Sequence, residues 1–268
     1  MGCCLLYLNI KIKVWLFLFA LLLIVSNKLS AQTLPQVIKQ IKPSIVGVGT
    51  LQATRRPPSN LLGTGFIVAD GYHVITNYHV IPKHINKQKK ESLVIFYRQA
   101  KSEQMKYRRV RVLASDKKHD LALLRIEGTK LPALKIETTR KPQEGQSIAF
   151  TGFPIGAVLG LFPVTHRGII SAISPVVIPA PSSSTLSVKM IKRLKNPYFV
   201  YQLDATAYPG NSGSPMFDAD NGKILGVINK VFIKESKESV LQKPSGITYA
   251  IPGKYIIKLL KENKISGY

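Results

Sequence analysis

The stretch SIVGVGTL at residues 44–51, followed by GFIVA at 65–69 and HVIT at 73–76, sets the pattern of the chain. Such segments are short, rich in β-branched residues and bounded by turn-forming residues, as strands are. Eight more follow, at residues 93–97, 107–113, 121–126, 146–151, 164–173, 198–203, 223–229 and 247–251. Eleven strands without helices between them predict an all-β fold of antiparallel strands, built as barrels or a sandwich, and argue against a wound α/β sheet.

Helical periodicity occurs mainly at the two ends of this β region. Residues 34–41 predict a short opening helix, and residues 254–263 carry an apolar stripe with lysines opposite. Residues 175–187 and 234–245 have the composition of long loops. Residues 138–146 form the natural boundary between two β halves.

The composition limits the class of protein. With 268 residues, 45% of them hydrophobic, the chain can bury one large core or two small ones, and intrinsic disorder is excluded. The two cysteines, Cys3 and Cys4, are adjacent near the start. A disulfide framework and a cysteine-based zinc site are therefore excluded.

The first 31 residues have the pattern of a secretory signal peptide. Lys11 and Lys13 precede an unbroken apolar run at residues 14–25, which polar residues and the small pair Ser30–Ala31 follow. An uncleaved membrane anchor is the alternative. Because residues 1–31 hold three lysines and no acid, residues 32–268 keep a net charge of +21 and contain no cysteine. We expect an exported protein, periplasmic or secreted, that is held together by packing alone.

The sharpest local motif is Gly210-Asn211-Ser212-Gly213-Ser214. Two glycines around Asn-Ser allow a tight turn that exposes the serine hydroxyl and points backbone N–H groups into one concavity. A serine nucleophile with an oxyanion site needs this arrangement. Taken alone, the motif is equally typical of an ordinary turn.

A serine nucleophile also needs a base and a carboxylate that orients the base. His79 directly follows an apolar strand, and Asp120 opens the buried-looking strand at 121–126. A structural histidine and a turn aspartate are the plain alternatives, and Asp116 is a rival for the carboxylate. His79, Asp120 and Ser212, separated by 41 and 92 residues, stand in the chain order of the chymotrypsin-type triad. A metal site built from His73, His79 and His84 matches no zinc signature.

Six motifs in register give the chain a specific resemblance. It resembles the trypsin-like serine proteases of the HtrA/Deg group over about residues 37–264, in the segments Gly63–Val68, Thr76–Val80, His119–Leu124, Gln202–Ala205, Gly210–Ser214 and Tyr249–Pro252. The resemblance implies a protease domain at 32–268. It would comprise a six-stranded barrel at about 37–137, a second at about 146–252 and a terminal helix at about 253–264.

The resemblance also implies roles for individual residues. Ser212 would be the nucleophile, His79 the general base, and Asp120 the group that orients His79. The backbone N–H groups of Gly210 and Ser212 would form the oxyanion hole. No cofactor and no metal is expected, and the substrates would be proteins or peptides.

Two features depart from that group. Its members usually continue into PDZ domains, and we expect none here. Ser214 replaces the glycine usual in the group, a change that is not expected to inactivate the site.

The sequence limits which substrate side chains the specificity pocket is expected to accept. Thr206 occupies the position expected at the pocket base, and residues 205–209 hold no carboxylate, so a preference for Lys or Arg is not expected. Ile228 is expected in the wall. We predict cleavage after small or medium apolar residues.

The segment at residues 83–118 is strongly basic, with 12 Lys and Arg against three acids. It could attract anionic envelope polymers, although solvated strand edges are the plainer explanation. Export argues against nucleic acid as a partner. Homo-oligomers, often found in the group, are a further expectation. The alternative function is a catalytically silent or latent protein of the same fold that binds peptides or anionic surfaces.

Overall fold

The computed structural model describes residues 15, 32–98, 105–154, 162–175, 197–229 and 247–268. The chain divides into two compact units, at residues 1–32 and 33–268. The predicted signal peptide, residues 1–31, falls in the first unit, and Trp15 is its one described residue, so this prediction lies outside the described residues. Among those residues, no helix has the length and apolar character needed to span a membrane.

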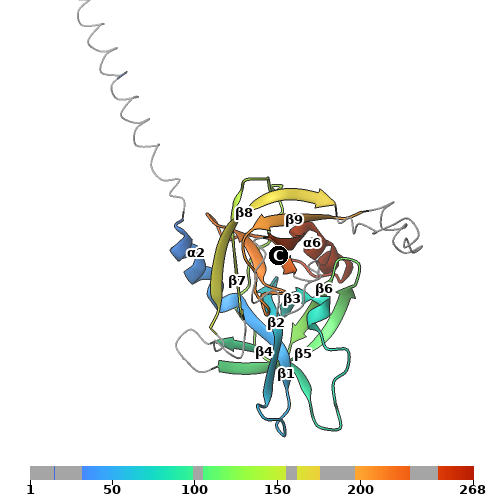
Figure 1. The fold of residues 1–268 in the computed structure, drawn as a ribbon. Helices are drawn as coiled ribbons and strands as arrows, with labels where there is room; N and C mark the ends of the chain where they lie inside the picture. Colours follow the sequence, from blue (N-terminus) through green and yellow to red (C-terminus); the bar gives the residue numbers. More distant parts are fainter. Residues whose placement is uncertain (1–14, 16–31, 99–104, 155–161, 176–196, 230–246) are drawn as a thin grey trace, which may run out of the picture. The chain divides into compact units, whose positions relative to one another are not determined.

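Two closed antiparallel barrels of six strands form the second unit (Figure 1). The first, in blue to green, runs in the order β1-β2-β3-β6-β5-β4, and the second in the order β7-β8-β9-β12-β11-β10. Both barrels therefore have the same topology, and the predicted all-β, two-barrel fold is confirmed. The first barrel consists of β1 (Ile45–Leu51), β2 (Ser59–Val68), β3 (His73–Asn77), β4 (Ser92–Arg98), β5 (Met105–Asp116) and β6 (Leu121–Ile126). The second consists of β7 (Ser147–Gly152), β8 (Val164–Pro175), β9 (Phe199–Asp204), β10 (Pro215–Asp218), β11 (Ile224–Asn229) and β12 (Ile247–Pro252).

Each of the eleven predicted strands is present, and the structure adds one. The strand that the sequence pattern misses is β10, which is only four residues long and begins with a proline. Since proline breaks a strand pattern and β10 directly follows a turn motif, its four residues give no separate signal. β2 begins at Ser59, earlier than the predicted residue 65, because residues 59–64, which mix polar residues and a glycine with two leucines, also pair with β1.

The two predicted helices are α2 (Leu34–Ile41) and α6 (Gly253–Glu262). α2 buries Val37 and Ile41 and leads into the short 3₁₀ turn η1 (Lys42–Ser44). The predicted loop at 234–245 lies outside the described residues. So does the predicted loop at 175–187, except for Pro175, which ends β8.

Three apolar clusters hold the unit together. One fills the first barrel and one fills the second. The third takes side chains from strands of both barrels, such as Phe66 and Phe217, together with Ile256 and Leu260 of α6. This shared core fixes the barrels against each other, so groups contributed by different barrels can be held in one geometry.

Candidate active site

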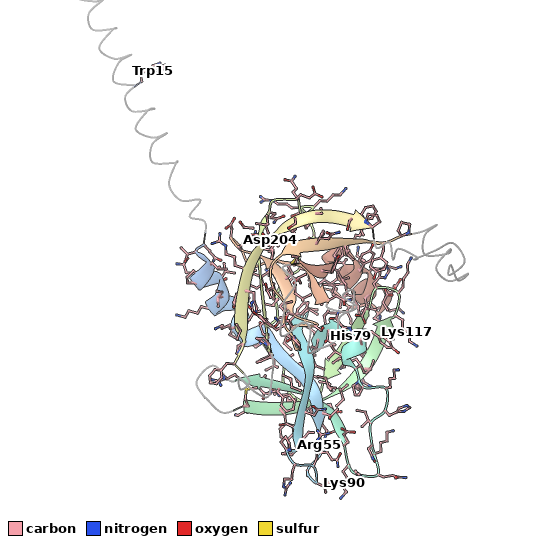
Figure 2. The ribbon with its side chains drawn as sticks, in the orientation of Figure 1. Trp15, Arg55, His79, Lys90, Lys117 and Asp204 are labelled. Atoms are coloured by element: carbon pink, nitrogen blue, oxygen red, sulfur yellow. The ribbon has the colours of Figure 1, made fainter. Side chains whose placement is uncertain are left out.

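His79 lies at the end of β3, in the short 3₁₀ turn η2 (Tyr78–Val80). Its side chain is one-third exposed, whereas the β3 residues before it are buried. Lys117, in the same β5–β6 hairpin as Asp120, places Nζ 5.4 Å from the ring centroid of Tyr78, the residue before His79. Figure 2 labels His79 and Lys117. The turn therefore presents the imidazole to solvent from a rigid strand end.

The Asp120 carboxylate accepts three hydrogen bonds. The backbone N–H of His79 donates to Oδ1 at 2.9 Å, His79 Nδ1 donates to Oδ2 at 2.6 Å, and Asn229 Nδ2 donates to Oδ2 at 2.9 Å. An ionised carboxylate only accepts, so His79 carries its proton on Nδ1 and, when neutral, keeps a lone pair on Nε2. This is the tautomer that a general base needs.

The β5–β6 hairpin determines which aspartate reaches His79. Asp120 has φ 52°, a left-handed conformation that aspartate tolerates better than most residues, directly before β6 begins at Leu121. Its carbonyl accepts the Tyr78 N–H at 3.0 Å and Asn77 Nδ2 at 3.1 Å, which ties the hairpin to the His79 turn.

Asp116, the rival aspartate, has a different partner. Its Oδ2 lies 2.5 Å from Nδ1 of the buried His119, and its Oδ1 accepts the N–H groups of Lys118 and His119. Although partial burial alone would raise the pKa of Asp116, these hydrogen bonds and the nearby imidazole lower it. Asp116 therefore shapes the hairpin and does not contact His79.

Ser212 lies in a loop of two turns between β9 and β10. The first turn is closed by Asn211 N–H to Tyr208 O at 3.0 Å, with Pro209 second and Gly210, at φ +98°, third. Because proline fixes a negative φ, positive φ at the third residue makes this a type II turn. The second turn is closed by Ser214 N–H to Asn211 O at 3.0 Å, and Gly213 within it has φ +87°.

Thr64 of β2 anchors this loop from the other barrel. Its N–H donates to Ser212 O at 2.8 Å, its Oγ1 donates to Gly210 O at 2.7 Å, and the same Oγ1 accepts the Phe153 N–H at 3.0 Å. The neighbouring Gly63 permits the close approach: a Cβ there would lie 2.7 Å from Val80 Cγ2 and 2.9 Å from Ser212 O. Because residue 63 is glycine, the side chain of Val80, which follows His79, and the backbone of Ser212 can both pack against it.

Ser212 is 7% exposed. The hydrogen bonds described for Ser212 and His79 include none between their side chains. The N–H groups of Gly210 and Ser212 donate to no backbone carbonyl within the described part of the chain. Within that part of the chain the two amides have no backbone acceptor, and their role in an oxyanion site stays a prediction.

Asn211, which precedes Ser212, is fully buried and contacts His166 of β8. Asn211 Nδ2 lies 3.4 Å from His166 Nε2, and the imidazole stacks on Phe150 at 4.9 Å between ring centroids. Burial lowers the pKa of His166, which favours the neutral ring that can accept from the amide. Two buried oxygens in this region, Asn211 Oδ1 and Ser214 Oγ, have no partner among the described residues.

The predicted pocket residues lie beside the same loop. Thr206 is half-buried, and Ile228 exchanges backbone hydrogen bonds with Gly213 and Ser214 at 3.0 and 2.9 Å. The Ile228 side chain is fully buried in the core of the second barrel. Residues 230–246, which follow β11, lie outside the described residues, and the specificity pocket stays a prediction.

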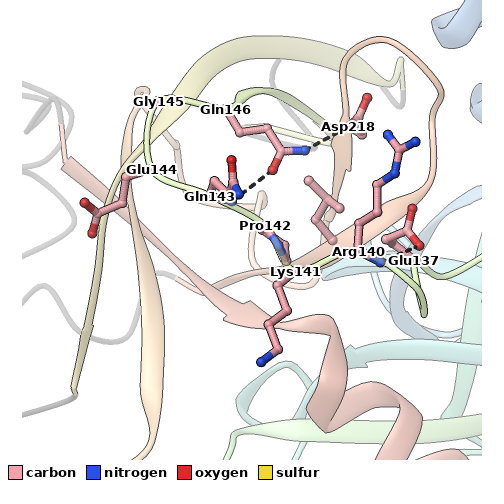
Figure 3. A pocket seen from close by; sticks show the side chains of 10 residues that line it. Glu137, Arg140, Lys141, Pro142, Gln143, Glu144, Gly145, Gln146 and Asp218 are labelled. Atoms are coloured by element: carbon pink, nitrogen blue, oxygen red, sulfur yellow. Dashed lines mark hydrogen bonds between the residues drawn. The ribbon is translucent and has the colours of Figure 1, made fainter.

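A separate pocket of about 620 Å³ lies along the segment that connects the two barrels (Figure 3). Gln146 Nε2 donates to Asp218 Oδ2 at 2.8 Å across it, and Gln146 Oε1 accepts the Gln143 N–H at 3.1 Å. Glu137 in its wall pairs with Lys223 at 3.2 Å. The pocket contains none of the predicted catalytic residues.

This fold and geometry agree with comparisons to known proteins. Residues 63–227, more than half of the chain, match the model of the trypsin-like peptidase domain. The chain belongs to the trypsin-like peptidase family. The resemblance predicted from the six motifs is confirmed at that level.

Relatives of this trypsin-like chain are DegP-like. It is 24% identical over 303 residues to a probable periplasmic serine endoprotease of Pseudomonas fluorescens, covering 96% of this chain and 55% of the relative. It is 31% identical over 222 residues to one from Rickettsia prowazekii, covering 80% and 36%. A serine endoprotease from Yersinia pestis has the same fold, with TM-score 0.60 and 23% identity over 86% of this chain and 66% of that one. The chain spans about half the length, or less, of these two curated relatives.

Sequence reasoning missed three residues that organise the site. Asn229 reaches Asp120 from the second barrel, Thr64 anchors the Ser212 loop from the first, and His166 contacts Asn211. Thr64 stands within the Gly63–Val68 motif, but its role depends on a contact with Gly210, 146 residues away.

Proposed function

We propose that the protein is an exported serine endopeptidase that uses Ser212, His79 and Asp120. The observation that carries the proposal is the Asp120 carboxylate, with His79 bound through both its backbone N–H and Nδ1. This arrangement leaves His79 Nε2 able to accept a proton, on an imidazole that is one-third exposed. A turn aspartate and a structural histidine would not require it.

The proposed reaction has two halves. Ser212 Oγ attacks the carbonyl carbon of the scissile peptide while His79 Nε2 takes the hydroxyl proton. The tetrahedral oxyanion binds the N–H groups of Gly210 and Ser212. His79 then returns the proton to the leaving amine, and an acyl-enzyme ester remains. Water attacks the ester with His79 again as base, which releases the new carboxyl end and regenerates the serine.

We propose cleavage after small or medium apolar residues. In support, no carboxylate lies between Ala205 and Pro209. The Ile228 side chain is buried in the core of the second barrel, so only its backbone lies beside the Ser212 loop. A peptide-library profile tests this. Preference for Val, Ala, Ile or Leu is expected, and preference for Arg or Lys would exclude it.

Export belongs to the same proposal. Both relatives named above are described as periplasmic, and the pattern at residues 1–31 is that of a signal peptide. N-terminal sequencing of the protein recovered from the envelope fraction tests it. A new terminus near residue 32 is expected, while an intact start in the membrane fraction would favour the anchor.

Covalent labelling of the purified protein with a fluorophosphonate probe tests the chemistry. The wild type should be labelled, and Ser212→Ala and His79→Ala should not. Ser214→Ala is the matched control, because it removes a nearby serine hydroxyl from the same loop and should leave labelling intact. A folded wild type that binds peptides without labelling would point to the silent binding protein instead.

A further inference from the structure

Three basic side chains lie in one row across neighbouring strands of the first barrel. His73 of β3 is paired directly with Arg125 of β6, and Arg125 is paired directly with Arg111 of β5. Directly opposed residues in an antiparallel sheet share a face. His73 is buried, Arg125 is half-buried and Arg111 is exposed, so the row runs from the interior to the surface.

A fourth basic residue meets this row from the end of α6. After the helix, the Ile265 N–H bonds back to Leu260 O at 3.0 Å, and Lys264 takes a left-handed conformation with φ 58°. Lys264, Arg111 and Arg125 then line one pocket of about 490 Å³. Elements far apart in the sequence thus place three basic residues in the lining of one cavity.

The acid in this pocket is Asp70, and its carboxylate is already engaged. Oδ1 accepts the Tyr72 N–H at 2.9 Å and His73 Nδ1 at 2.7 Å. Partial burial would raise the pKa of Asp70, but these hydrogen bonds and the nearby charges lower it, so the group is ionised at neutral pH. Arg111, Arg125 and Lys264 against the Asp70 carboxylate give the lining a formal net charge of +2, with His73 left out of the count.

This excess charge is not neutralised within the described part of the chain. None of the ion pairs there involves Arg111, Arg125 or Lys264. Like charges directly opposite each other in a sheet are destabilising, and Arg111 and Arg125 form such a pair. An anion between them would remove this repulsion.

We propose that this pocket binds a phosphate monoester group. A phosphate monoester carries a charge close to −2 at neutral pH, which matches the pocket, whereas a carboxylate would neutralise only half of it. Two guanidinium groups suit the tetrahedral oxyanion, since each can donate two hydrogen bonds to it. Leu113, which is 38% exposed, and Ile265 give the rim an apolar side for the organic part of the ligand.

The pocket is separate from the candidate active site. His79 follows the end of β3 and Asp120 precedes the start of β6, where Asn77 pairs with Leu121. His73 and Arg125 pair at the start of β3 and near the end of β6. Three residue pairs lie between these two pairs, a separation of four residue steps or about 13 Å. The proposal therefore holds whether or not the protein is a protease.

Calorimetric titration of the purified protein with glycerol 3-phosphate, at constant ionic strength in chloride, tests the site. We expect saturable binding, weakened at least tenfold in the double variant Arg111→Gln/Lys264→Gln. The matched control is Arg109→Gln/Lys261→Gln, which removes the same charge outside the pocket, from the same strand β5 and from the last turn of α6 just before Lys264, and should change affinity less than twofold. Equal loss in both double variants, or no saturable binding, would overturn the proposal.

Two further measurements sharpen the result. Without ligand, Arg111→Gln should raise the melting temperature, because it removes the repulsion with Arg125. Arg109 is paired with Val94, so Arg109→Gln should not raise it. Equal shifts in melting temperature would contradict the charge argument. Inorganic phosphate and vesicles containing phosphatidic acid distinguish the source of the group. Binding of the soluble phosphates alone assigns a soluble ligand, and added binding to the vesicles, lost in Arg111→Gln/Lys264→Gln, assigns a lipid headgroup.

Discussion

Asn229 of β11 donates a hydrogen bond from Nδ2 to Asp120 Oδ2 at 2.9 Å, and so joins the second barrel to the carboxylate carried by the first. Asn229 is fully buried. The candidate acid–base pair belongs to the first barrel and the candidate nucleophile to the second. This contact therefore fixes Asp120 relative to the barrel that carries Ser212.

Replacing Asn229 by alanine should lower kcat/KM of the proposed protease about tenfold or more. The change removes a buried hydrogen bond to a charged group, which contributes about 1.5–3 kcal/mol. It also frees Asp120 to turn away from His79. Steady-state hydrolysis of an apolar peptide substrate, together with thermal unfolding, measures both effects.

Asn263→Ala is the control for that variant. Asn263 also donates a side-chain hydrogen bond, to Leu259 O at 2.8 Å, but at the end of α6. We expect it to lower stability and leave kcat/KM unchanged. An Asn229→Ala enzyme that loses stability and keeps full kcat/KM would show that Asn229 has only a structural role.

The fold could be predicted from the sequence because each strand carries its own apolar pattern and turn boundaries. Leu121–Ile126 shows this best, since the predicted and observed bounds coincide. β10 escaped prediction because strand pairing with β7 and β11, rather than local pattern, defines its four residues.

The candidate site could be predicted less completely from the sequence. Chain order pointed to His79, Asp120 and Ser212, whose catalytic roles stay a prediction. The choice between Asp116 and Asp120 depends on the hairpin register and on the left-handed φ of Asp120, neither of which a residue pattern reveals. Asn229 and Thr64 act across the two barrels, over 109 and 146 residues of sequence.

Gly213→Ala should destabilise the Ser212 loop. A Cβ at this position would lie 2.0 Å from Thr64 O and 2.6 Å from Thr76 Oγ1, and φ is +87°. We expect a loss of about 3 kcal/mol or more in the free energy of unfolding.

Gly145→Ala isolates the backbone effect, because φ is +81° there and nothing lies within 4 Å. It should cost about 1 kcal/mol. Chemical denaturation of both variants gives the comparison, and equal losses would mean that the contact with Thr64 is relieved by movement.

Glu137 should make stability depend on acid pH. Desolvation alone would raise its pKa, but hydrogen bonds from Thr139 and Arg140, together with Lys223, lower the pKa from 4.5 to about 2. The folded state thus favours the ionised form. Its contribution is complete above pH 4.5 and is lost as the pH falls toward 2. Glu137→Gln should be less stable than wild type at pH 7, and the difference should vanish near pH 2. Urea unfolding across this range measures it, and a constant difference would refute the assignment.

His166 should support the Ser212 loop through its neutral imidazole. His166→Phe can keep the stacking on Phe150 but removes the acceptor for Asn211 Nδ2, and His166→Gln can restore an acceptor without a titrating ring. Because the hydrogen bond is long, at 3.4 Å, we expect a loss of about fivefold in kcat/KM for the phenylalanine variant, equivalent to about 1 kcal/mol. Recovery in the glutamine variant is the decisive outcome.

The same histidine should affect stability in mild acid. Burial lowers the pKa of His166 below 6.5, so the folded state favours the neutral ring and this preference costs stability as the pH falls below 6.5. His166→Gln cannot take up that proton. Its free energy of unfolding should therefore fall less steeply than that of the wild type between pH 6.5 and 5. Parallel curves for the two proteins would show that His166 takes up no extra proton on unfolding, and the neutral-ring account of the Asn211 contact would fail with it.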